Sequence, residues 1–134
     1  MRIIQKSALA VIKDNKLLAV RPHNSQFLLM PGGKPNLGES AVAALKREIR
    51  EELDCSIDEK TITLLGTFED VAAGNNGSRV RIDLYSGKLK GTPKPSSEIE
   101  ELKWISANDA LNPFVTPIIK KQIIPFLIER KMLI

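Results

Sequence analysis

The sequence is poor in cysteine, histidine and aromatic residues. Its 134 residues include one Cys, one His, four Phe, one Trp and one Tyr. A single cysteine excludes an internal disulfide, which favours a reducing compartment. The few aromatic residues, and the lack of any Lys or Arg run longer than two, speak against a surface that binds nucleic acid by base stacking. We therefore expect no nucleic-acid partner.

Long hydrophobic runs are missing as well. No segment is apolar over the length of a membrane-spanning helix, and the residues after Met1 lack the apolar core of a signal peptide. We expect a cytoplasmic protein with no membrane partner. At 134 residues the chain fits one domain, residues 1–134, that can fold without crosslinks. Its formal net charge of +4 favours anionic ligands in a general way.

Acidic residues are concentrated in one short segment. Glu48, Glu51 and Glu52 stand at positions i, i+3 and i+4, which share one face of an α-helix. Like charges at this spacing destabilise a helix by about 0.2–0.5 kcal/mol per pair. A hard divalent cation such as Mg²⁺, which takes oxygen ligands, would offset that repulsion. The spacing therefore predicts a cation site on this helix.

The segment from Gly33 to Cys55, GKPNLGESAVAALKREIREELDC, resembles the signature box of Nudix hydrolases. The residues in register with that box are Gly33, Glu39, Arg47, Glu48, Ile49, Glu51 and Glu52. Two positions differ, because Asp54 stands where the family usually has glycine and Cys55 where it has an aliphatic residue. Glycine enters the left-handed region after a helix without a Cβ clash, whereas Asp does so less readily. We expect this departure to affect the turn after the helix rather than the chemistry.

The resemblance implies a fold, a cofactor and a reaction. The fold would be α/β, an α/β/α sandwich with a mixed β-sheet between helices. The cofactor would be Mg²⁺, with Mn²⁺ as the alternative, held by Glu48, Glu51 and Glu52. The reaction would be hydrolysis of the diphosphate linkage in a nucleoside diphosphate joined to a group X, with Glu51 or Glu52 also activating water. Homodimers are common in the family, but no pattern in this sequence fixes an interface.

Other charged residues complete the expected site. In the resembling family a further acid from a loop often assists catalysis. We rank Glu98 before Glu100 and Glu101 for this role, because the loop before the last strand is open to solvent. Arg47 lies about 100° from the acidic helix face and can turn back to Glu39 as a rigid, bidentate ion pair. We interpret this pair as structural support for the loop before the helix.

Glycines and arginines are the candidates for substrate contacts. Gly32 and Gly33 would let the backbone approach the metal or a phosphate closely, because no Cβ intervenes. An ordinary turn is the alternative for Gly32. Arg21, Arg79 and Arg81 could meet substrate phosphates, but solvent-facing positions on strands explain them equally well.

The remaining reactive or aromatic side chains have structural interpretations. His23 lies in a polar loop and is expected at the surface rather than as a general base. Cys55 is expected to be a small buried hydrophobic residue. Trp104 and Phe27 are candidates for stacking on a base, although core packing is the better expectation for Trp104, which precedes a helix cap in an apolar strand.

Hydrophobic periodicity predicts six strands. They are Ser7 to Ile12, Lys16 to Arg21, Phe27 to Met30, Thr61 to Phe68, Arg79 to Ser86, and Leu102 to Ile105. Turns are expected at Asp14-Asn15 and at Gly74-Asn75-Asn76-Gly77, where an Asn-Gly step suits a tight hairpin.

Cap residues predict where the helices begin. Ser40 is the expected N-cap of the acidic helix, with Glu39 as the alternative. Ser106 should cap a short helix, and Thr116-Pro117 should open a terminal one. Pro125 should kink or divide that last helix.

The leading substrate is a free (deoxy)nucleoside triphosphate, because the chain is small and has no added domain. ADP-ribose, a dinucleoside polyphosphate or a nucleotide sugar is the alternative, since no accompanying substrate motif follows the box. A nucleotide-sensing or partner-binding module with little turnover is a second class of function, and the intact acids argue against it. An enzyme that processes capped RNA would need a broad basic surface or an extra RNA-binding segment, and the sequence indicates neither.

Overall fold

The computed structural model describes residues 2–74 and 77–134. Its strands are β1 (Ile3–Ala10), β2 (Ile12–Lys13), β3 (Lys16–Pro22), β4 (Gly32–Gly33), β5 (Ser56–Ile57), β6 (Thr63–Val71), β7 (Arg79–Ser86), β8 (Leu89–Lys90) and β9 (Ile99–Ile105). Its helices are α1 (Ala41–Leu53) and α2 (Ile124–Glu129), with 3₁₀ turns at Glu59–Thr61 and Ala107–Leu111 and a π-helix at Ile119–Ile123.

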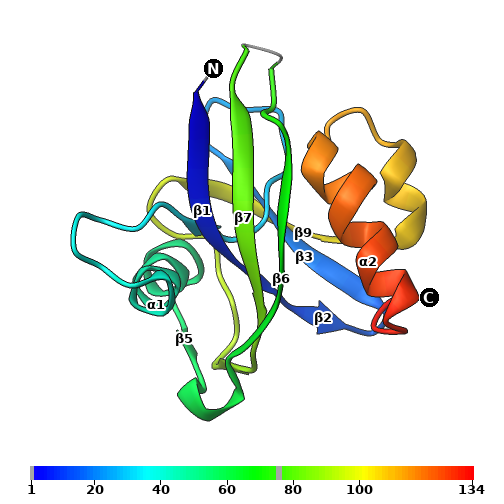
Figure 1. Ribbon diagram of the computed structural model, residues 1–134. Coiled ribbons are helices and arrows are strands. Elements are labelled where there is room, and N and C mark those ends of the chain that lie inside the picture. Colours follow the sequence, from blue (N-terminus) through cyan, green and yellow to red (C-terminus); the bar gives the residue numbers. More distant parts are fainter. Residues whose placement is uncertain (1, 75–76) are drawn as a thin grey trace.

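The central sheet has the strand order β4-β1-β7-β6 and is mixed. Strands β1 and β7 are parallel, while the β1–β4 and β7–β6 pairs are antiparallel. A second sheet has the order β2-β3-β9, and α1 and α2 lie on opposite sides of the molecule (Figure 1). This arrangement confirms the predicted α/β fold with a mixed sheet between helices.

The alternating side chains of β1 connect the two halves of the core. Ala8 and Ala10 belong to the cluster that includes the terminal helix, whereas Leu9 packs in the cluster beneath α1. Successive residues of a strand point to opposite faces, so one strand supports both layers. The strand therefore lies between the acidic helix and the apolar half of the molecule.

Helix α1 begins as the sequence predicts. Ser40 is the N-cap, and its Oγ accepts a hydrogen bond from the N–H of Ala43 at 3.1 Å. Leu45, Ile49 and Leu53 are fully buried against the sheet. This docking fixes the rotation of α1, so its acidic face is held at the edge of the sheet that carries β4.

Asp54 ends α1 in the left-handed conformation that glycine usually supplies. Its backbone has φ 52° and ψ 39°, and its N–H donates to the Arg50 carbonyl. The turn geometry is therefore kept, contrary to our expectation that the departure from glycine would affect it. This conformation destabilises the protein in two ways, because a residue with a Cβ lies in the left-handed region and a carboxylate lies near the negative end of the helix dipole.

Replacing Asp54 with glycine should therefore stabilise the protein. Asp54→Gly removes both costs, and we expect the free energy of unfolding to rise by about 0.5–1 kcal/mol despite the greater freedom of glycine in the unfolded chain. Urea denaturation of both proteins measures the change. Asp54→Ala removes the carboxylate but keeps the Cβ, so it should gain less than the glycine variant, and a glycine variant less stable than the natural protein would contradict this interpretation.

Two of the predicted strands are divided or absent in the structure. The segment Ser7–Ile12 is divided at Val11, because β1 belongs to the central sheet and β2 to the second one. The prediction of a strand at Phe27–Met30 is wrong. Leu28 and Leu29 form only isolated bridges, to Val115 and Val20 respectively, because this segment crosses between two sheets and each residue meets a different neighbour.

The other boundaries are shifted or confirmed. Strand β7 has the predicted limits, β6 lies two to three residues later than predicted, and β9 begins at Ile99 instead of Leu102. Asp14 and Asn15 both have positive φ and form the predicted turn. The predicted hairpin turn includes Asn75 and Asn76, which lie outside the described residues, although β6 and β7 pair as antiparallel neighbours.

The C-terminal helical segment shows the predicted interruption. Pro117 opens the segment, and the π-helix Ile119–Ile123 precedes α2, in which Pro125 occupies the first turn. Proline has no N–H for the α-helical ladder, so the segment changes its hydrogen-bonding pattern here. Among the described residues, no helix is long and apolar enough to cross a membrane.

Candidate metal and substrate site

Three carboxylates converge at the end of α1. One oxygen from each of Glu48, Glu52 and Glu98 lies within 4.8 Å of the other two. Glu52 is buried, Glu48 is half-buried and Glu98 is exposed, so the group opens to solvent on the side of Glu98. Three hard oxygen donors at this separation fit a divalent cation such as Mg²⁺, which completes its octahedron with water or phosphate oxygens.

The loop before β9 is tied to the last turn of α1. The N–H groups of Lys94 and Ser96 donate to the carbonyls of Leu53 and Glu52, at 2.9 and 3.0 Å. These are among the helix carbonyls that have no partner within α1. Because the loop satisfies them, it passes close to the helix end and delivers Glu98 to the two helical glutamates.

The two glycines of β4 allow close contacts on two sides, with Glu48 of α1 and with the backbone of β1. A Cβ on Gly33 would overlap the carboxylate of Glu48, and a Cβ on Gly32 would overlap the carbonyl of Ser7. The N–H of Gly32 donates to Oε1 of Glu52 at 3.0 Å. Glycine therefore allows the backbone of β4 to lie directly against the acidic face of α1.

Arg47 links the helix to the loop before it. Its Nε and Nη2 donate to the two carboxylate oxygens of Glu39 at 3.0 and 2.9 Å, and Nη2 also donates to the Lys34 carbonyl at 3.0 Å. Its Nη1 donates to Oε1 of Glu48 at 2.6 Å. The hydrogen bonds with Glu39 raise the pKa of Arg47 and lower that of Glu39, so both groups are charged. One guanidinium thus fixes the loop and orients Glu48.

Burial raises the pKa of the Glu48 and Glu52 carboxyl groups. It raises the pKa of Glu52 to about 8, and the neighbouring charges of Glu48 and Glu98 add to the rise while the Gly32 N–H opposes it. Burial also raises the pKa of Glu48, against the effect of the Arg47 hydrogen bond. A positive ion at this point would favour the ionised forms of both carboxylates, against the burial that raises their pKa.

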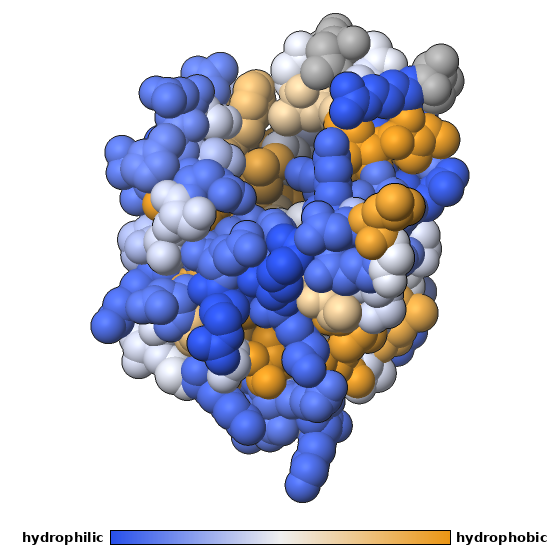
Figure 2. All heavy atoms as spheres, turned by 90° about the vertical axis from the view of Figure 1, so that its left-hand side faces the viewer, coloured by the Kyte–Doolittle hydropathy of each residue, from blue (hydrophilic) through white to orange (hydrophobic). Residues whose placement is uncertain are grey.

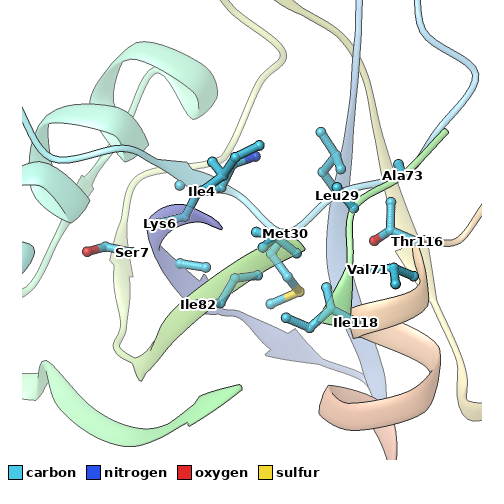
Figure 3. Close-up of a pocket in the computed structure, with 14 residues that line it drawn as sticks. Ile4, Lys6, Ser7, Leu29, Met30, Val71, Ala73, Ile82, Thr116 and Ile118 are labelled. Atoms are coloured by element: carbon cyan, nitrogen blue, oxygen red, sulfur yellow. The ribbon is translucent and has the colours of Figure 1, made fainter. Parts of the chain in front are cut away.

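An apolar cavity of about 200 Å³ adjoins the acidic group. Gly32 lines the cavity, and its N–H donates a hydrogen bond to Oε1 of Glu52. Figure 3 shows Lys6 at the end of the cavity toward α1, Met30 in the middle and Thr116 at the opposite end. A ligand in the cavity can therefore reach from the carboxylates to the start of the terminal helical segment.

The face that carries α1 is mostly hydrophilic. Figure 2 shows polar side chains over most of this face and apolar side chains in a recess toward its upper end. Charged and apolar surfaces therefore meet on one side of the molecule. Such a junction suits a ligand with a charged part and an apolar, planar part.

The remaining predicted acids lie apart from the carboxylate group. Glu51 is not a member of it, its side chain is 45% exposed, and its carboxylate lies 3.6 Å from Arg47. Glu100 faces His23 at 3.5 Å, and Glu101 pairs with Arg21 at 3.0 Å. Of the three loop acids, the structure thus brings only Glu98 to the helical glutamates.

The arginines proposed to contact substrate have carboxylate partners elsewhere. Arg21 binds Glu101, while Arg79 and Arg81 both bind Glu69 at 2.8 Å. None of these arginines lines the cavity beside the acidic group. Pairing across neighbouring strands positions these arginines, as expected if they are solvent-facing strand residues.

The other side chains largely follow their structural interpretations. His23 is exposed and Cys55 is buried, and burial raises the pKa of the Cys55 thiol. Trp104 is partly buried against the core beneath α1, and Phe27 is half-buried beside Arg21. Neither aromatic ring lines the cavity near the acids.

Two polar residues of the cavity were missed in the sequence. Lys6 stands in a strand whose next residues on the same face are Ala8 and Ala10, and a lysine in such a position was a usable signal. Burial lowers the pKa of the Lys6 ammonium, against the attraction of the Glu52 and Glu48 carboxylates. Thr116 was interpreted only as a helix-opening residue, and nothing in the local sequence indicates a cavity there.

Comparison with known proteins agrees with this architecture. A curated ADP-ribose pyrophosphatase from Methanocaldococcus jannaschii is 28% identical over 100 residues, which are 72% of this chain and 58% of that protein. The solution structure of the E. coli ORF135 protein is 25% identical, with a TM-score of 0.73 over 98% of this chain and 94% of that one. The crystal structure of MutT protein from Methanosarcina mazei shares the fold at 21% identity, with a TM-score of 0.75 over 97% and 96% of the two chains.

The family assignment comes from the sequence as a whole. The model of the NUDIX domain matches residues 4–127, which include most of β1, the acidic helix, the loop that carries Glu98 and most of α2. The match therefore extends well beyond the box that suggested it. The chain belongs to the Nudix family.

Proposed function

We propose that the protein is a Mg²⁺-dependent hydrolase that cleaves a diphosphate linkage in a nucleotide. The observation that carries the proposal is the convergence of Glu48, Glu52 and Glu98 beside a cavity that can receive the rest of the substrate. These three residues would hold the ion, and Mn²⁺ is the alternative metal. The ion would neutralise charge on the phosphate oxygens during attack by water.

The protein groups have separate tasks in this proposal. Glu51 or Glu52 accepts the proton of the attacking water. Arg47 orients Glu48 and holds the loop through Glu39, so it is a positioning residue. The backbone of Gly32 and Gly33 approaches the reacting phosphates without an intervening side chain.

The leading substrate in this proposal is a nucleoside triphosphate, and the size of the cavity fits the base of such a nucleotide. The cavity volume of about 200 Å³ is below the range of roughly 300–1,000 Å³ for pockets that hold a whole drug-sized ligand. It therefore suits a nucleobase, with the sugar and phosphates extending over the carboxylates. The alternative substrate is ADP-ribose, which the name of the archaeal relative suggests, followed by a dinucleoside polyphosphate and a nucleotide sugar.

Metal binding should strengthen steeply with pH. In the metal-free protein Glu52 is protonated below its pKa of about 8, whereas a metal ligand must be ionised. We expect the Mg²⁺ affinity to rise about tenfold per pH unit between pH 6 and 8 and to level off above. Isothermal titration with Mg²⁺ across this range measures it.

The stability of the metal-free protein should change in the opposite sense. The folded-state pKa of Glu52 lies above the ordinary value of 4.5. Protonated Glu52 therefore contributes to the free energy of unfolding at low pH, and this contribution is lost as pH rises toward about 8. Glu52→Gln, which cannot ionise, should remove this slope. An equal slope in the variant would show that another group is responsible.

A panel of substrates tests the proposed reaction. The purified protein is incubated with Mg²⁺ and each of the nucleoside triphosphates, including oxidised ones, ADP-ribose, dinucleoside polyphosphates and nucleotide sugars. Product masses show which phosphate bond breaks, and parallel samples with EDTA establish the metal requirement. We expect turnover of at least one triphosphate. Tight binding without turnover across the panel would instead indicate a nucleotide-sensing module.

A further inference from the structure

The cavity beside the acidic group has a polar side chain at each end. Its described lining residues are mainly apolar, and Lys6 and Thr116 carry the hydrogen-bonding side chains at the two ends (Figure 3). Ser7 also contributes to the lining, but its oxygen points away from the labelled apolar side chains in this view. The cavity is therefore an apolar slot with one donor near the acids and one hydroxyl at its far end.

Thr116 is an unusual buried residue because its hydroxyl has no partner within residues 2–74 and 77–134. The residue is 3% exposed, and its Oγ1 makes no hydrogen bond to any residue that the structure describes. The backbone is nevertheless fixed, because its N–H donates to the Leu28 carbonyl at 3.3 Å and its carbonyl accepts from Ile119 at 3.1 Å. A buried hydroxyl without a partner destabilises a protein unless a ligand satisfies it.

Lys6 sets the direction in which a nucleotide would lie. Its ammonium is attracted by the carboxylates of Glu52 and Glu48, so this end of the cavity is the one beside the proposed metal. The phosphates must lie at that end if the diphosphate is cleaved there. The base then extends past Met30 toward Thr116 (Figure 3).

We propose that the Thr116 hydroxyl is a specificity-determining contact to the polar edge of the substrate's nucleobase. The proposal rests on the proposed function, because it takes the orientation of the substrate from the metal site. Val80 and Ile82 contribute apolar surface to the cavity and can pack against a planar base. The base would then be held by its faces and recognised at its far edge by one neutral hydroxyl.

The chemistry of a hydroxyl defines the selectivity. A threonine can either donate or accept a hydrogen bond, and the described lining residues include no carboxylate or carboxamide. The site should therefore accept both keto and amino bases. It should discriminate instead against a base of the same shape that has no polar edge, because Thr116 would remain unpaired.

Nonpolar base isosteres test this inference. Dissociation constants are measured with Ca²⁺ in place of Mg²⁺, so that bound ligands stay intact, for dTTP and its difluorotoluene analogue and for dATP and its 4-methylbenzimidazole analogue. The natural protein should prefer the better natural nucleotide to its isostere by about 3- to 10-fold. Thr116→Val should lose this preference while keeping its affinity for the isostere, and Thr116→Ser should retain it.

Matched variants separate recognition from structure. Ser7→Ala removes the other buried hydroxyl that has no partner among the described residues; its oxygen points away from the apolar side chains labelled in Figure 3, so the preference should be unchanged. Thr116→Val should unfold at the same temperature as the natural protein or higher, because a buried unpaired group is removed. Equal binding of both members of each pair, or a preference that persists in Thr116→Val, overturns the inference. Discriminating binding without any Mg²⁺-dependent turnover overturns the proposed function alone.

Discussion

Glu52→Gln should abolish Mg²⁺-dependent turnover without unfolding the protein. Glu52 is the most buried of the three converging carboxylates, and a glutamine there offers the ion no negative charge. Changing groups that merely support a metal ligand costs about 10- to 100-fold, and loss of the ligand itself should exceed that. We expect kcat/KM to fall by more than about 100-fold in steady-state assays of the substrate that the panel identifies.

The structure also predicts that this variant is stable. Because the pKa of Glu52 is about 8, the natural side chain is already neutral at pH 7 in the metal-free protein, and glutamine resembles that state. The thermal midpoint should match or exceed that of the natural protein. Glu129→Gln, an exposed acid on α2, is the matched control and should retain full activity. Turnover of Glu52→Gln within a few-fold of the natural protein would remove the acidic group from the mechanism.

Arg47→Ala should reduce both stability and rate. The guanidinium makes four hydrogen bonds, two to Glu39, one to the Lys34 carbonyl and one to Glu48. Its removal leaves the loop before α1 untied and Glu48 without its orienting partner. We expect the thermal midpoint to fall by about 5 °C and kcat/KM by about 10- to 100-fold. Calorimetry and steady-state kinetics measure the two effects.

Two other variants distinguish positioning from general charge. Arg47→Lys keeps the charge but cannot form the bidentate pair, so it should recover part of the stability and little of the rate. Arg50→Ala, an exposed arginine on the same helix, should change neither. A folded and fully active Arg47→Ala would refute the supporting role.

Local features of the sequence were sufficient to predict α1 and its surroundings. The cap at Ser40, the buried positions of Leu45 and Ile49 and the pair between Arg47 and Glu39 all depend on residues close in sequence. Helical periodicity relates such residues directly to positions in space. The same periodicity placed Glu51 beside Glu48 and Glu52, and only the packing shows that Glu51 faces Arg47 and solvent.

Features that depend on distant segments could not be predicted in this way. Glu98 reaches the acids because Lys94 and Ser96 satisfy carbonyls at the end of α1, and local sequence does not encode which loop will do so. The cavity combines Lys6 of the first strand with Thr116 near the last helix. Such combinations are set by strand order and helix packing, which hydrophobic patterns leave open.

Binding of Mn²⁺ followed by electron paramagnetic resonance tests the metal site most directly. Titrating the natural protein at pH 8 should show bound Mn²⁺ that Mg²⁺ displaces, while Glu52→Gln and Glu98→Gln should each weaken binding by at least about tenfold. Glu129→Gln should bind as the natural protein does. Absence of bound Mn²⁺ in the natural protein, or equal binding in all four proteins, would contradict a cation site at Glu48, Glu52 and Glu98.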